Sequence, residues 1–276
     1  MDLEFQIYDY RETHINLDED SEVETMGEYV VQIFGRTMDG KSVYAKLTNF
    51  QPRFYIGIPQ KWSNREISRM EKYLKSSENK SIWKMHRDCL TKVGLVKKKK
   101  AYGFTNNKIF KYAVLFFTNL WACKKFSYLF EHRKVYIPGV TSKGLKFNVY
   151  ESNLAPLIRC FHIQDIPGCG WVKSDSHTLV DSSEKESICD YEIMLPYTNL
   201  LPIEKDCNAP LRICSFDIEC YSYDGKFPQA RRSKDKIIQI GSTYNYLGNK
   251  EIYRQHIVTL DTCNKIEGAV VESFDN

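Results

Sequence analysis

The residues Arg212–Cys220 place the tightest constraint on the fold of this chain, because polar and apolar side chains alternate along them. Alternation with a period of two is typical of a β-strand whose two faces meet different surroundings. We expect a short strand with an apolar face buried against a core, formed by Cys214, Phe216, Ile218 and Cys220. The opposite face carries Ile213, Ser215, Asp217 and Glu219.

The acids Asp217 and Glu219 are two residues apart, so on a strand their carboxylates point the same way, about 7 Å apart. A hard divalent cation such as Mg²⁺ or Mn²⁺ relieves their repulsion, because such ions prefer carboxylate oxygens. The same spacing recurs at Asp2/Glu4, Asp20/Glu22 and Asp190/Glu192. The first two read as solvated charges, and the third as the exposed face of an ordinary strand. For Asp217/Glu219 two alternatives remain, a metal site and a half-exposed structural strand.

A family resemblance favours the metal site. The stretch Ser215–Cys220 resembles the first exonuclease motif of the family B DNA polymerases, in particular the delta-type replicative catalytic subunits of eukaryotes and large DNA viruses. Other stretches resemble the same family in register, namely Tyr102–Phe104, Lys108–Phe117, Tyr150–Asn153, Gly168–Val172, Ala209–Ile213, Phe227–Pro228 and Asp235–Gly241. The likeness therefore extends from Tyr102 to Gly241.

The resemblance implies a DNA-directed DNA polymerase that acts in DNA replication and carries a 3′–5′ proofreading exonuclease. Asp217 and Glu219 would be metal ligands and catalytic residues of a two-metal site that takes Mg²⁺ or Mn²⁺. The implied partners are primer–template DNA, a single-stranded 3′ end, deoxynucleoside triphosphates and a sliding clamp. The implied location is intracellular, either the nucleus or, for a viral member, the host nucleus or a cytoplasmic replication site.

The resemblance also implies that this chain is the amino-terminal portion of such a polymerase. In the family, further carboxylates, a tyrosine that orients the water, and the palm and fingers all follow downstream of the first motif. The acids after Glu219 do not stand in such motifs, so we expect an incomplete metal site and no activity from the chain alone. The alternative is a stand-alone nucleic-acid-binding or structural module in which the carboxylates are idle.

The predicted organisation is an α+β amino-terminal domain over residues 1–202, a connector over 203–210, and the incomplete 3′–5′ exonuclease domain over 211–276. The polar stretch between Pro202 and Pro210 sets the boundary. Three strands are expected beyond it, at Arg212–Cys220, Lys236–Tyr246 and Glu251–Thr259, in an antiparallel meander. The resemblance implies that this meander begins a ribonuclease H-like α/β fold.

Local signals predict the elements of the amino-terminal domain. Asp39–Gly40 marks a hairpin turn between two strands, and a long acidic loop is expected over Asp9–Glu28. The predicted strands are Leu3–Tyr8, Tyr29–Phe34, Ser42–Leu47, Arg53–Ile58 as a continuation of the same sheet, and Ile109–Phe117. The predicted helices run from the capping box Ser63–Glu66 to Lys75, from the cap Asn119 to His132, and over Glu151–Gln164. The side chains of Trp121, Phe126, Leu129 and Phe130 are assigned to the core, and Leu154, Leu157, Ile158 and Phe161 to one helix face.

The one concentrated basic run comprises Lys97, Lys98, Lys99 and Lys100. It has two interpretations, a solvated loop and a set of phosphate contacts, because lysines neutralise a nucleic-acid backbone without reading its sequence. Tyr102 follows directly and offers a ring on which a base can stack. These lysines and Tyr102 are therefore candidate nucleic-acid-binding residues, although a net charge of +4 does not by itself indicate such a protein.

Composition excludes several other classes of protein. The 276 residues are 42% hydrophobic and 27% charged, as expected of a globular protein with a sizeable core. The longest apolar run, Ala113–Phe117, is too short to cross a membrane, and Met1–Glu4 does not resemble a signal peptide. The nine cysteines include no Cys-x-x-Cys pair, so zinc and redox motifs find no support. We expect reduced thiols, with Cys214 and Cys220 buried.

Overall fold

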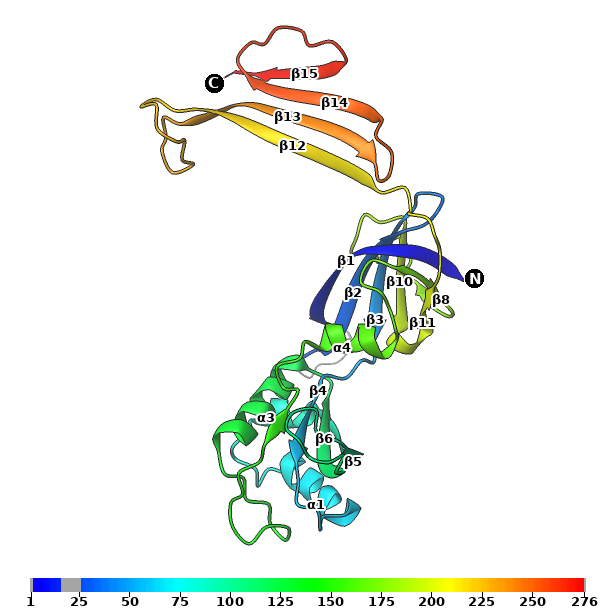
Figure 1. Cartoon of the computed structure of the whole chain (residues 1–276), viewed down its shortest axis with the longest axis vertical. Helices are drawn as coiled ribbons and strands as arrows, with labels where there is room; N and C mark the ends of the chain where they lie inside the picture. Colours follow the sequence, from blue (N-terminus) through cyan, green and yellow to red (C-terminus); the bar gives the residue numbers. More distant parts are fainter. Residues whose placement is uncertain (1, 16–25, 276) are drawn as a thin grey trace. The chain divides into compact units, whose positions relative to one another are not determined.

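The computed structural model describes residues 2–15 and 26–275, and the chain divides into two units. The first unit comprises Met1–Gly35 and Ser42–Glu204, and the second comprises Arg36–Lys41 and Lys205–Asn276. Figure 1 labels most of the elements of the two units, which are described separately below. None of the helices in the described residues has the length and apolarity needed to cross a bilayer.

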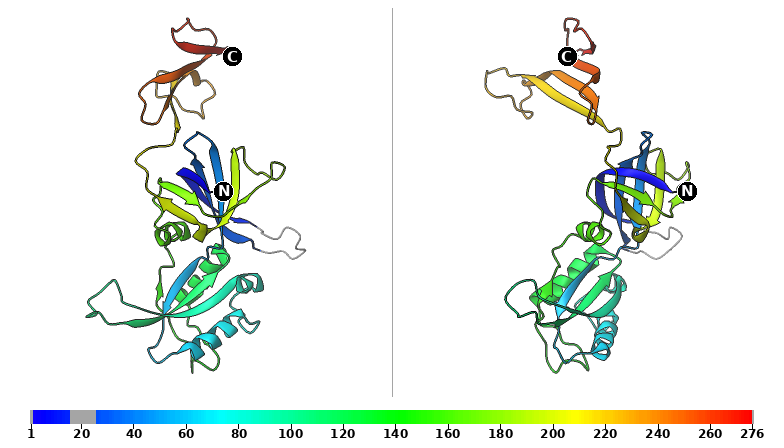
Figure 2. Two further views of the ribbon diagram at one scale, coloured as in Figure 1. Left: turned by 90° about the vertical axis from the view of Figure 1, so that its right-hand side faces the viewer. Right: turned by 45° about the vertical axis from the view of Figure 1, so that its right-hand side comes forward.

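The first unit contains, among its described residues, a curved seven-stranded sheet in the order β11-β8-β1-β2-β3-β10-β9 (Figure 2). Its strands are β1 (Leu3–Ile15), β2 (Glu28–Arg36), β3 (Ser42–Thr48), β8 (Trp171–Ser174), β9 (Thr178–Leu179), β10 (Tyr191–Pro196) and β11 (Leu200–Ile203), with the short helix η1 (Tyr197–Asn199) before β11. The expected hairpin is confirmed, since β2 and β3 are neighbours. Its turn is closed by the Thr37 amide, which donates to the Lys41 carbonyl.

The loop expected over Asp9–Glu28 is wrong in its first part, because β1 continues to Ile15. Specific partners hold this polar segment in place. The Tyr29 hydroxyl donates a hydrogen bond of 2.6 Å to Glu12, and the Tyr10 ring meets the edge of Phe161 at 5.2 Å. Residues 16–25 of the expected loop lie outside the described residues.

The first unit also contains a second sheet, which in the described residues has four strands in the order β5-β6-β4-β7. Its strands are β4 (Arg53–Gly57), β5 (Leu90–Lys98), β6 (Phe110–Phe117) and β7 (Val149–Tyr150), and its helices are α1 (Asn64–Lys75), α2 (Lys84–Asp88) and α3 (Leu120–His132). Strand β4 was expected to continue the first sheet and instead pairs with β6. The alternation of Phe54 and Ile56, both 0% exposed, identifies a strand but not the sheet that contains it.

The two predicted helix caps are confirmed. Ser63 and Glu66 form the capping box of α1, and the Asn119 side chain accepts from the amides of Trp121 and Ala122 at the start of α3. Phe126 and Phe130 are buried as expected, but Trp121 is 58% exposed. It lies in the first turn of α3, beside the cap, and the Lys124 ammonium lies 5.2 Å from its ring centroid.

Helix α4 (Pro156–Ile163) is shorter than the expected helix over Glu151–Gln164. Glu151 has a φ of 58°, a left-handed conformation that no α-helix contains, and Pro156 occupies the first turn, where it is tolerated. The expected apolar face is wrong in part, because Leu157 and Phe161 pack in the core, whereas Leu154 is 38% exposed and Ile158 is 60% exposed. Arg159 is buried instead. The cost of burying the Arg159 guanidinium is offset by an ion pair of 2.8 Å with Glu151 and by a hydrogen bond that it donates to the Arg53 carbonyl.

In the second unit, the described residues form a four-stranded sheet in the order β12-β13-β14-β15. Strands β12 (Arg212–Tyr221), β13 (Lys236–Tyr246) and β14 (Ile252–Leu260) are antiparallel, which confirms the predicted meander. Strand β15 (Ala269–Phe274), which the sequence interpretation missed, pairs parallel to β14. The described part of this unit contains no helix.

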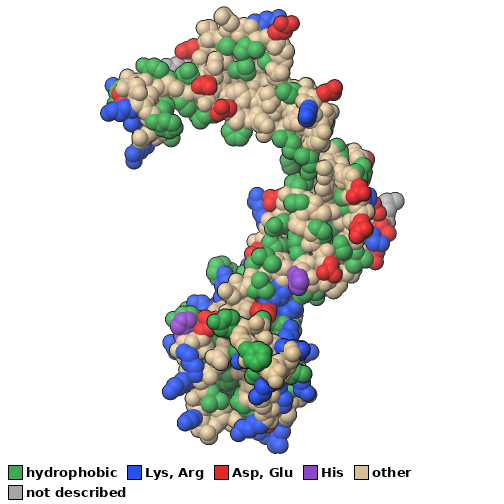
Figure 3. Space-filling view, viewed as in Figure 1, with side chains coloured by type: hydrophobic (Ala, Val, Ile, Leu, Met, Phe, Trp, Pro, Cys, Tyr) green, Lys and Arg blue, Asp and Glu red, His purple; other side chains and the backbone are tan. Residues whose placement is uncertain are grey.

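The apolar face of β12 is exposed, contrary to the prediction of a buried strand. Phe216 is 71% exposed and Ile218 is 44% exposed. Cys214 is exposed and Cys220 is half-buried. Figure 3 shows hydrophobic side chains on the surface of this sheet. Alternation along a strand distinguishes its two faces, but it does not reveal whether another element covers either of them.

Candidate functional site

The first candidate site is the polar face of β12. The antiparallel register places Asp217 opposite Gly241 and Glu219 opposite Gln239 on β13. Directly opposite residues of an antiparallel pair share a face, so both carboxylates lie on one face with Gln239. The pairing shifts by one residue between Glu219 and Cys220, and a bulge of this kind re-aims the side chains beside it.

The two carboxylates have few partners. The amide of Ile218 donates to Asp217 Oδ1 at 2.8 Å, whereas the Glu219 carboxylate has no hydrogen bond or ion pair within the described residues. Both acids are exposed. A Cβ atom built on Gly241 would meet nothing within 4 Å, so the space beside Asp217 is open. A ligand from solvent can therefore reach both carboxylates without first displacing an ion-pair partner.

The donor set fits a hard divalent cation only in part. Carboxylate oxygens are the ligands that Mg²⁺ and Mn²⁺ prefer. Across residues 2–15 and 26–275, however, no three His, Cys, Asp or Glu side chains gather closely enough to form a metal site. An ion held by Asp217 and Glu219 alone would keep most of its coordination positions for water or a ligand.

The pair Asp190/Glu192 has the same spacing and a different setting. Glu192 is 0% exposed, so the expected exposed face is wrong. Its carboxylate lies 3.4 Å from the Lys46 ammonium and accepts a hydrogen bond of 2.8 Å from the Ser187 hydroxyl. Asp190 accepts from the amide and the hydroxyl of Ser42, both at 2.8 Å. These acids are occupied by structural partners.

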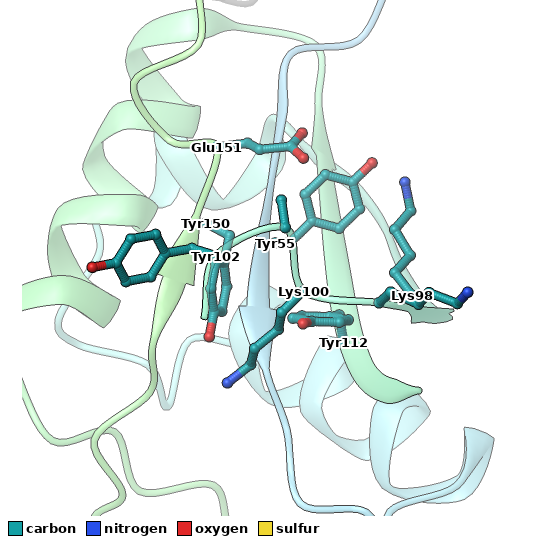
Figure 4. A pocket seen from close by; sticks show the side chains of 9 residues that line it. Tyr55, Lys98, Lys100, Tyr102, Tyr112, Tyr150 and Glu151 are labelled. Carbon is teal, nitrogen blue, oxygen red and sulfur yellow. The ribbon is translucent and has the colours of Figure 1, made fainter. Parts of the chain in front are cut away.

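The second candidate site is the basic run, which the structure divides. Lys98 ends β5, and its ammonium lies 5.1 Å from the Tyr55 ring centroid. The Lys100 ammonium lies 4.6 Å from the Phe110 ring centroid. Lys98, Lys99, Lys100 and Tyr102 line one hollow of about 390 Å³ (Figure 4). Lys97 does not line it, because neighbouring residues of a strand point to opposite faces.

The other walls of this hollow are tyrosines that the sequence interpretation missed. Tyr55 comes from β4, Tyr112 from β6 and Tyr150 from β7. The rings of Tyr112 and Tyr150 meet edge to face, with centroids 5.3 Å apart. Burial raises the pKa of Tyr112, with a smaller contribution from Tyr150 in the same direction. One sign of this hollow was present in the sequence. Tyr55 lies between the apolar residues Phe54 and Ile56, so its side chain belongs to the opposite face of β4.

Comparison with known proteins identifies a family. Residues 147–276 match the family model described as the exonuclease domain of DNA polymerase family B. A DNA polymerase of Acanthamoeba polyphaga mimivirus is 38% identical over 98% of this chain. The chain is thus similar in sequence to family B DNA polymerases. A DNA polymerase delta catalytic subunit of Dictyostelium discoideum is 28% identical over 87% of the chain.

The chain covers only part of the proteins that it resembles. It spans 16% of the mimivirus polymerase and 22% of the Dictyostelium subunit. In fold it resembles the family B DNA polymerase of Pyrobaculum calidifontis, with a TM-score of 0.59 over 94% of this chain and 27% of that one. At 15% identity this last likeness concerns the fold alone.

Proposed function

We propose that this chain is the amino-terminal part of a DNA-directed DNA polymerase of family B that carries a 3′–5′ proofreading exonuclease and acts in DNA replication. In this proposal residues 1–202 form the amino-terminal domain, 203–210 the connector, and 211–276 the start of a ribonuclease H-like exonuclease domain. One observation carries it: an open, largely unpaired carboxylate pair, Asp217 and Glu219, lies on one face of a strand inside the segment that matches the exonuclease domain.

Asp217 and Glu219 would hold Mg²⁺ or Mn²⁺. Bound ions would supply an activated water and charge stabilisation for the leaving oxygen of a 3′-terminal phosphodiester. The contribution of this chain is positional, because β12 fixes both carboxylates on one face. The absence of a side chain at Gly241 leaves room beside Asp217 for the end of a DNA strand.

The substrates in this proposal are primer–template DNA, its single-stranded 3′ end and deoxynucleoside triphosphates. A sliding clamp is a further partner, and the location is the nucleus or a viral replication site. The 276-residue chain by itself is expected to show no exonuclease turnover, because its described residues bring only two acids to the site. Lys97–Lys100 and Tyr102 are proposed to contact the DNA.

The test replaces both acids in the polymerase that contains this chain. Asp217→Ala with Glu219→Ala should reduce the rate of excision of a mismatched 3′ nucleotide by about a thousandfold or more. The reason is that bound metal would stabilise the charge of the transition state by several kcal/mol. Extension of a matched primer should be nearly unchanged. The control is Glu251→Ala, an exposed acid just before β14. Wild-type excision by the double variant would rule out this pair as the metal site.

A further inference from the structure

Helix α3 has one face that packs on the second sheet and one that faces solvent. Its buried residues include Phe126 and Phe130, and the centroid of the Phe130 ring lies 6.2 Å from that of Phe54 on β4. The solvent face carries two large rings, Trp121 and Tyr128, which are 58% and 57% exposed. They are two turns, or about 10 Å, apart along the helix. A surface helix ordinarily carries polar residues on its solvent side, so two exposed rings in line depart from the usual pattern.

Basic side chains lie between and after these rings. Five exposed side chains at spacings of three and four residues share the solvent side of the helix, which we call the outer face of α3: Trp121, Lys124, Lys125, Tyr128 and His132. In α3, all of whose residues are described, Glu131 is the one acid. Its carboxylate accepts a hydrogen bond of 2.6 Å from the Ser152 hydroxyl. The outer face of α3 is therefore positively charged.

Helix α2 extends this surface, since α2 and α3 are in contact. Burial, and then the positive charge of Lys125, hold the pKa of His86 below its usual range, so Lys125 lies near α2. The ring of Trp83, the residue that precedes α2, lies 6.3 Å from the His86 ring between centroids and is 74% exposed. A third exposed ring thus lies beside the lysines. Large apolar surface of this kind, with polar groups around it, marks interaction sites.

The packing of the rings favours a protein ligand over a nucleic acid. The His132 ring is stacked on that of Tyr128, with centroids 4.1 Å apart. The Lys124 ammonium lies over the Trp121 ring, 5.2 Å from its centroid. Bases bind aromatic side chains by stacking on ring faces, and each of these rings already has a partner on one face. Trp and Tyr are instead the residues that often dominate the binding energy of protein interfaces.

We propose that the outer face of α3, together with Trp83, docks an acidic amphipathic helix of a partner protein. Two helices that lie side by side meet at intervals of about seven residues, which is the separation of Trp121 and Tyr128. Apolar side chains of the partner would cover these rings, and its carboxylates would meet Lys124 and Lys125. Opposite charges across an interface fix its register and exclude wrong partners. The inference does not depend on the proposed exonuclease site.

The probe is a fluorescein-labelled peptide of about 18 residues, in which Leu recurs every three or four positions and Glu fills most of the others. Its binding to the 276-residue chain is measured by anisotropy. We expect a dissociation constant on the order of 10 µM at low salt, which weakens as salt is added because exposed charges are screened. Two control peptides, with Gln in place of Glu and with Ser in place of Leu, should each bind about tenfold more weakly or worse.

Two double variants of the outer face separate its rings from its charges. Trp121→Ala with Tyr128→Ala should weaken binding of the Glu/Leu peptide by about 30-fold or more, since aromatic anchors dominate interface energies. Lys124→Glu with Lys125→Glu should weaken it by about tenfold at low salt and by less at high salt. All four side chains are exposed, so both variants should fold, which urea unfolding confirms.

The matched control is Lys250→Glu with Lys265→Glu. It makes the same change of charge at two exposed residues of the second unit and should leave the affinity for the peptide nearly unchanged. A loss as large as that of the Lys124→Glu/Lys125→Glu chain would show that the peptide responds only to net charge. The Asp217→Ala/Glu219→Ala chain should bind the peptide like the wild type, so a failure here is distinct from a failure of the proposed exonuclease site.

Three further outcomes would overturn the inference. The first is no binding of the Glu/Leu peptide up to about 1 mM, and the second is equal affinity for the Glu and Gln peptides. The third is wild-type affinity in the Trp121→Ala/Tyr128→Ala chain. A thymidine oligomer that displaces the peptide, and that loses as much affinity as the peptide does in this double variant, would make the outer face a nucleic-acid surface instead.

Discussion

The acid pairs Asp190/Glu192, at the start of β10, and Asp217/Glu219, on β12, have the same spacing and differ in what surrounds them. On β10, Glu192 is fully buried against Lys46. On β12, Asp217 and Glu219 face open space beside Gly241. Spacing on a strand fixes the direction of two carboxylates, but the neighbouring strands decide whether protein groups or an external ligand satisfy them.

The difference follows from the pairing of each strand. Strand β10 is paired on both sides, parallel to β3 and antiparallel to β9, and β3 supplies Lys46 directly opposite Met194. Strand β12 is an edge strand of the described sheet and pairs with β13 alone. The facing positions on β13 are Gly241 and Gln239, neither of which carries a positive charge. Within the described residues, the pair on β12 is therefore exposed and has no cationic partner.

The largest difference in stability should come from replacing the isoleucines next to these acids, Ile193 beside Glu192 and Ile218 between Asp217 and Glu219. Ile193 on β10 is 0% exposed and Ile218 on β12 is 44% exposed. Ile193→Ala should lower the free energy of unfolding of the first unit by about 4 kcal/mol, since the substitution leaves a cavity in the core. Ile218→Ala should cost far less because it removes little buried area. Urea unfolding followed by tryptophan fluorescence and circular dichroism checks both, and equal losses would contradict the difference in burial.

Replacing the acids themselves should change the free energy of unfolding in the same direction, by a smaller amount. Glu192→Ala should lower the free energy of unfolding by about 3 kcal/mol, because it leaves Lys46 buried without its buried partner. Lys46 keeps its ion pair of 2.8 Å with Glu186, so the loss should fall at the lower end of the usual range. Glu219→Ala should not reduce the urea midpoint. A destabilised Glu219→Ala protein would show that β12 has structural partners for this acid.

Several local features were predicted correctly from the sequence. The alternation over Arg212–Cys220 predicts β12, and the expected antiparallel meander is confirmed by β13 and β14. The caps Ser63 and Asn119 begin helices as expected. Each of these features depends on residues close together in the chain, so periodicity and hydrogen-bonding chemistry identify them.

The same local patterns did not predict which side chains are buried by parts of the chain distant in sequence. Phe216 alternates like a core residue and is exposed, whereas Glu192 was expected on an exposed face and is buried. The hollow beside the basic run is lined by Tyr55, Tyr112 and Tyr150, which come from three strands far apart in the sequence. The division of the lysine run depends on β5, a strand that the sequence interpretation did not predict, because Lys97 and Lys98 are neighbours on it and point to opposite faces.

The pH dependence of stability should reveal the buried acid. Burial by itself would raise the pKa of Glu192, but hydrogen bonds from Ser187 and from the Glu186 and Ser187 amides, together with Lys46, outweigh it and hold the pKa below its usual range. The unfolded chain then binds the proton more readily. This contribution to stability is present above the unfolded-state pKa and is lost as the pH falls through the folded-state pKa.

Urea unfolding of the first unit between pH 7 and pH 3 measures this dependence. The wild type should lose more stability on acidification than Glu192→Gln, whose side chain does not titrate. The difference between the two profiles should vanish below the folded-state pKa of Glu192, apart from a constant offset for the substitution itself. Parallel profiles across the whole range would show that Glu192 does not titrate differently on folding.

The smallest expected effect is the binding of metal to the isolated chain. Asp217 and Glu219 are exposed, and no third acid of the described residues lies close enough to join them in a metal site. The pair should therefore hold Mn²⁺ with a dissociation constant on the order of 1 mM. At 1 mM free Mn²⁺ this stabilises the folded second unit by only about 0.4 kcal/mol. Water-proton relaxation detects such weak binding directly. Asp217→Asn with Glu219→Gln should abolish it, whereas Asp190→Asn, whose parent carboxylate is bound to Ser42, should leave it intact. Micromolar affinity would mean that the chain supplies a more complete ligand set than its described residues contain. Loss of binding in Asp190→Asn would place the ion at Asp190, next to β10, instead of on β12.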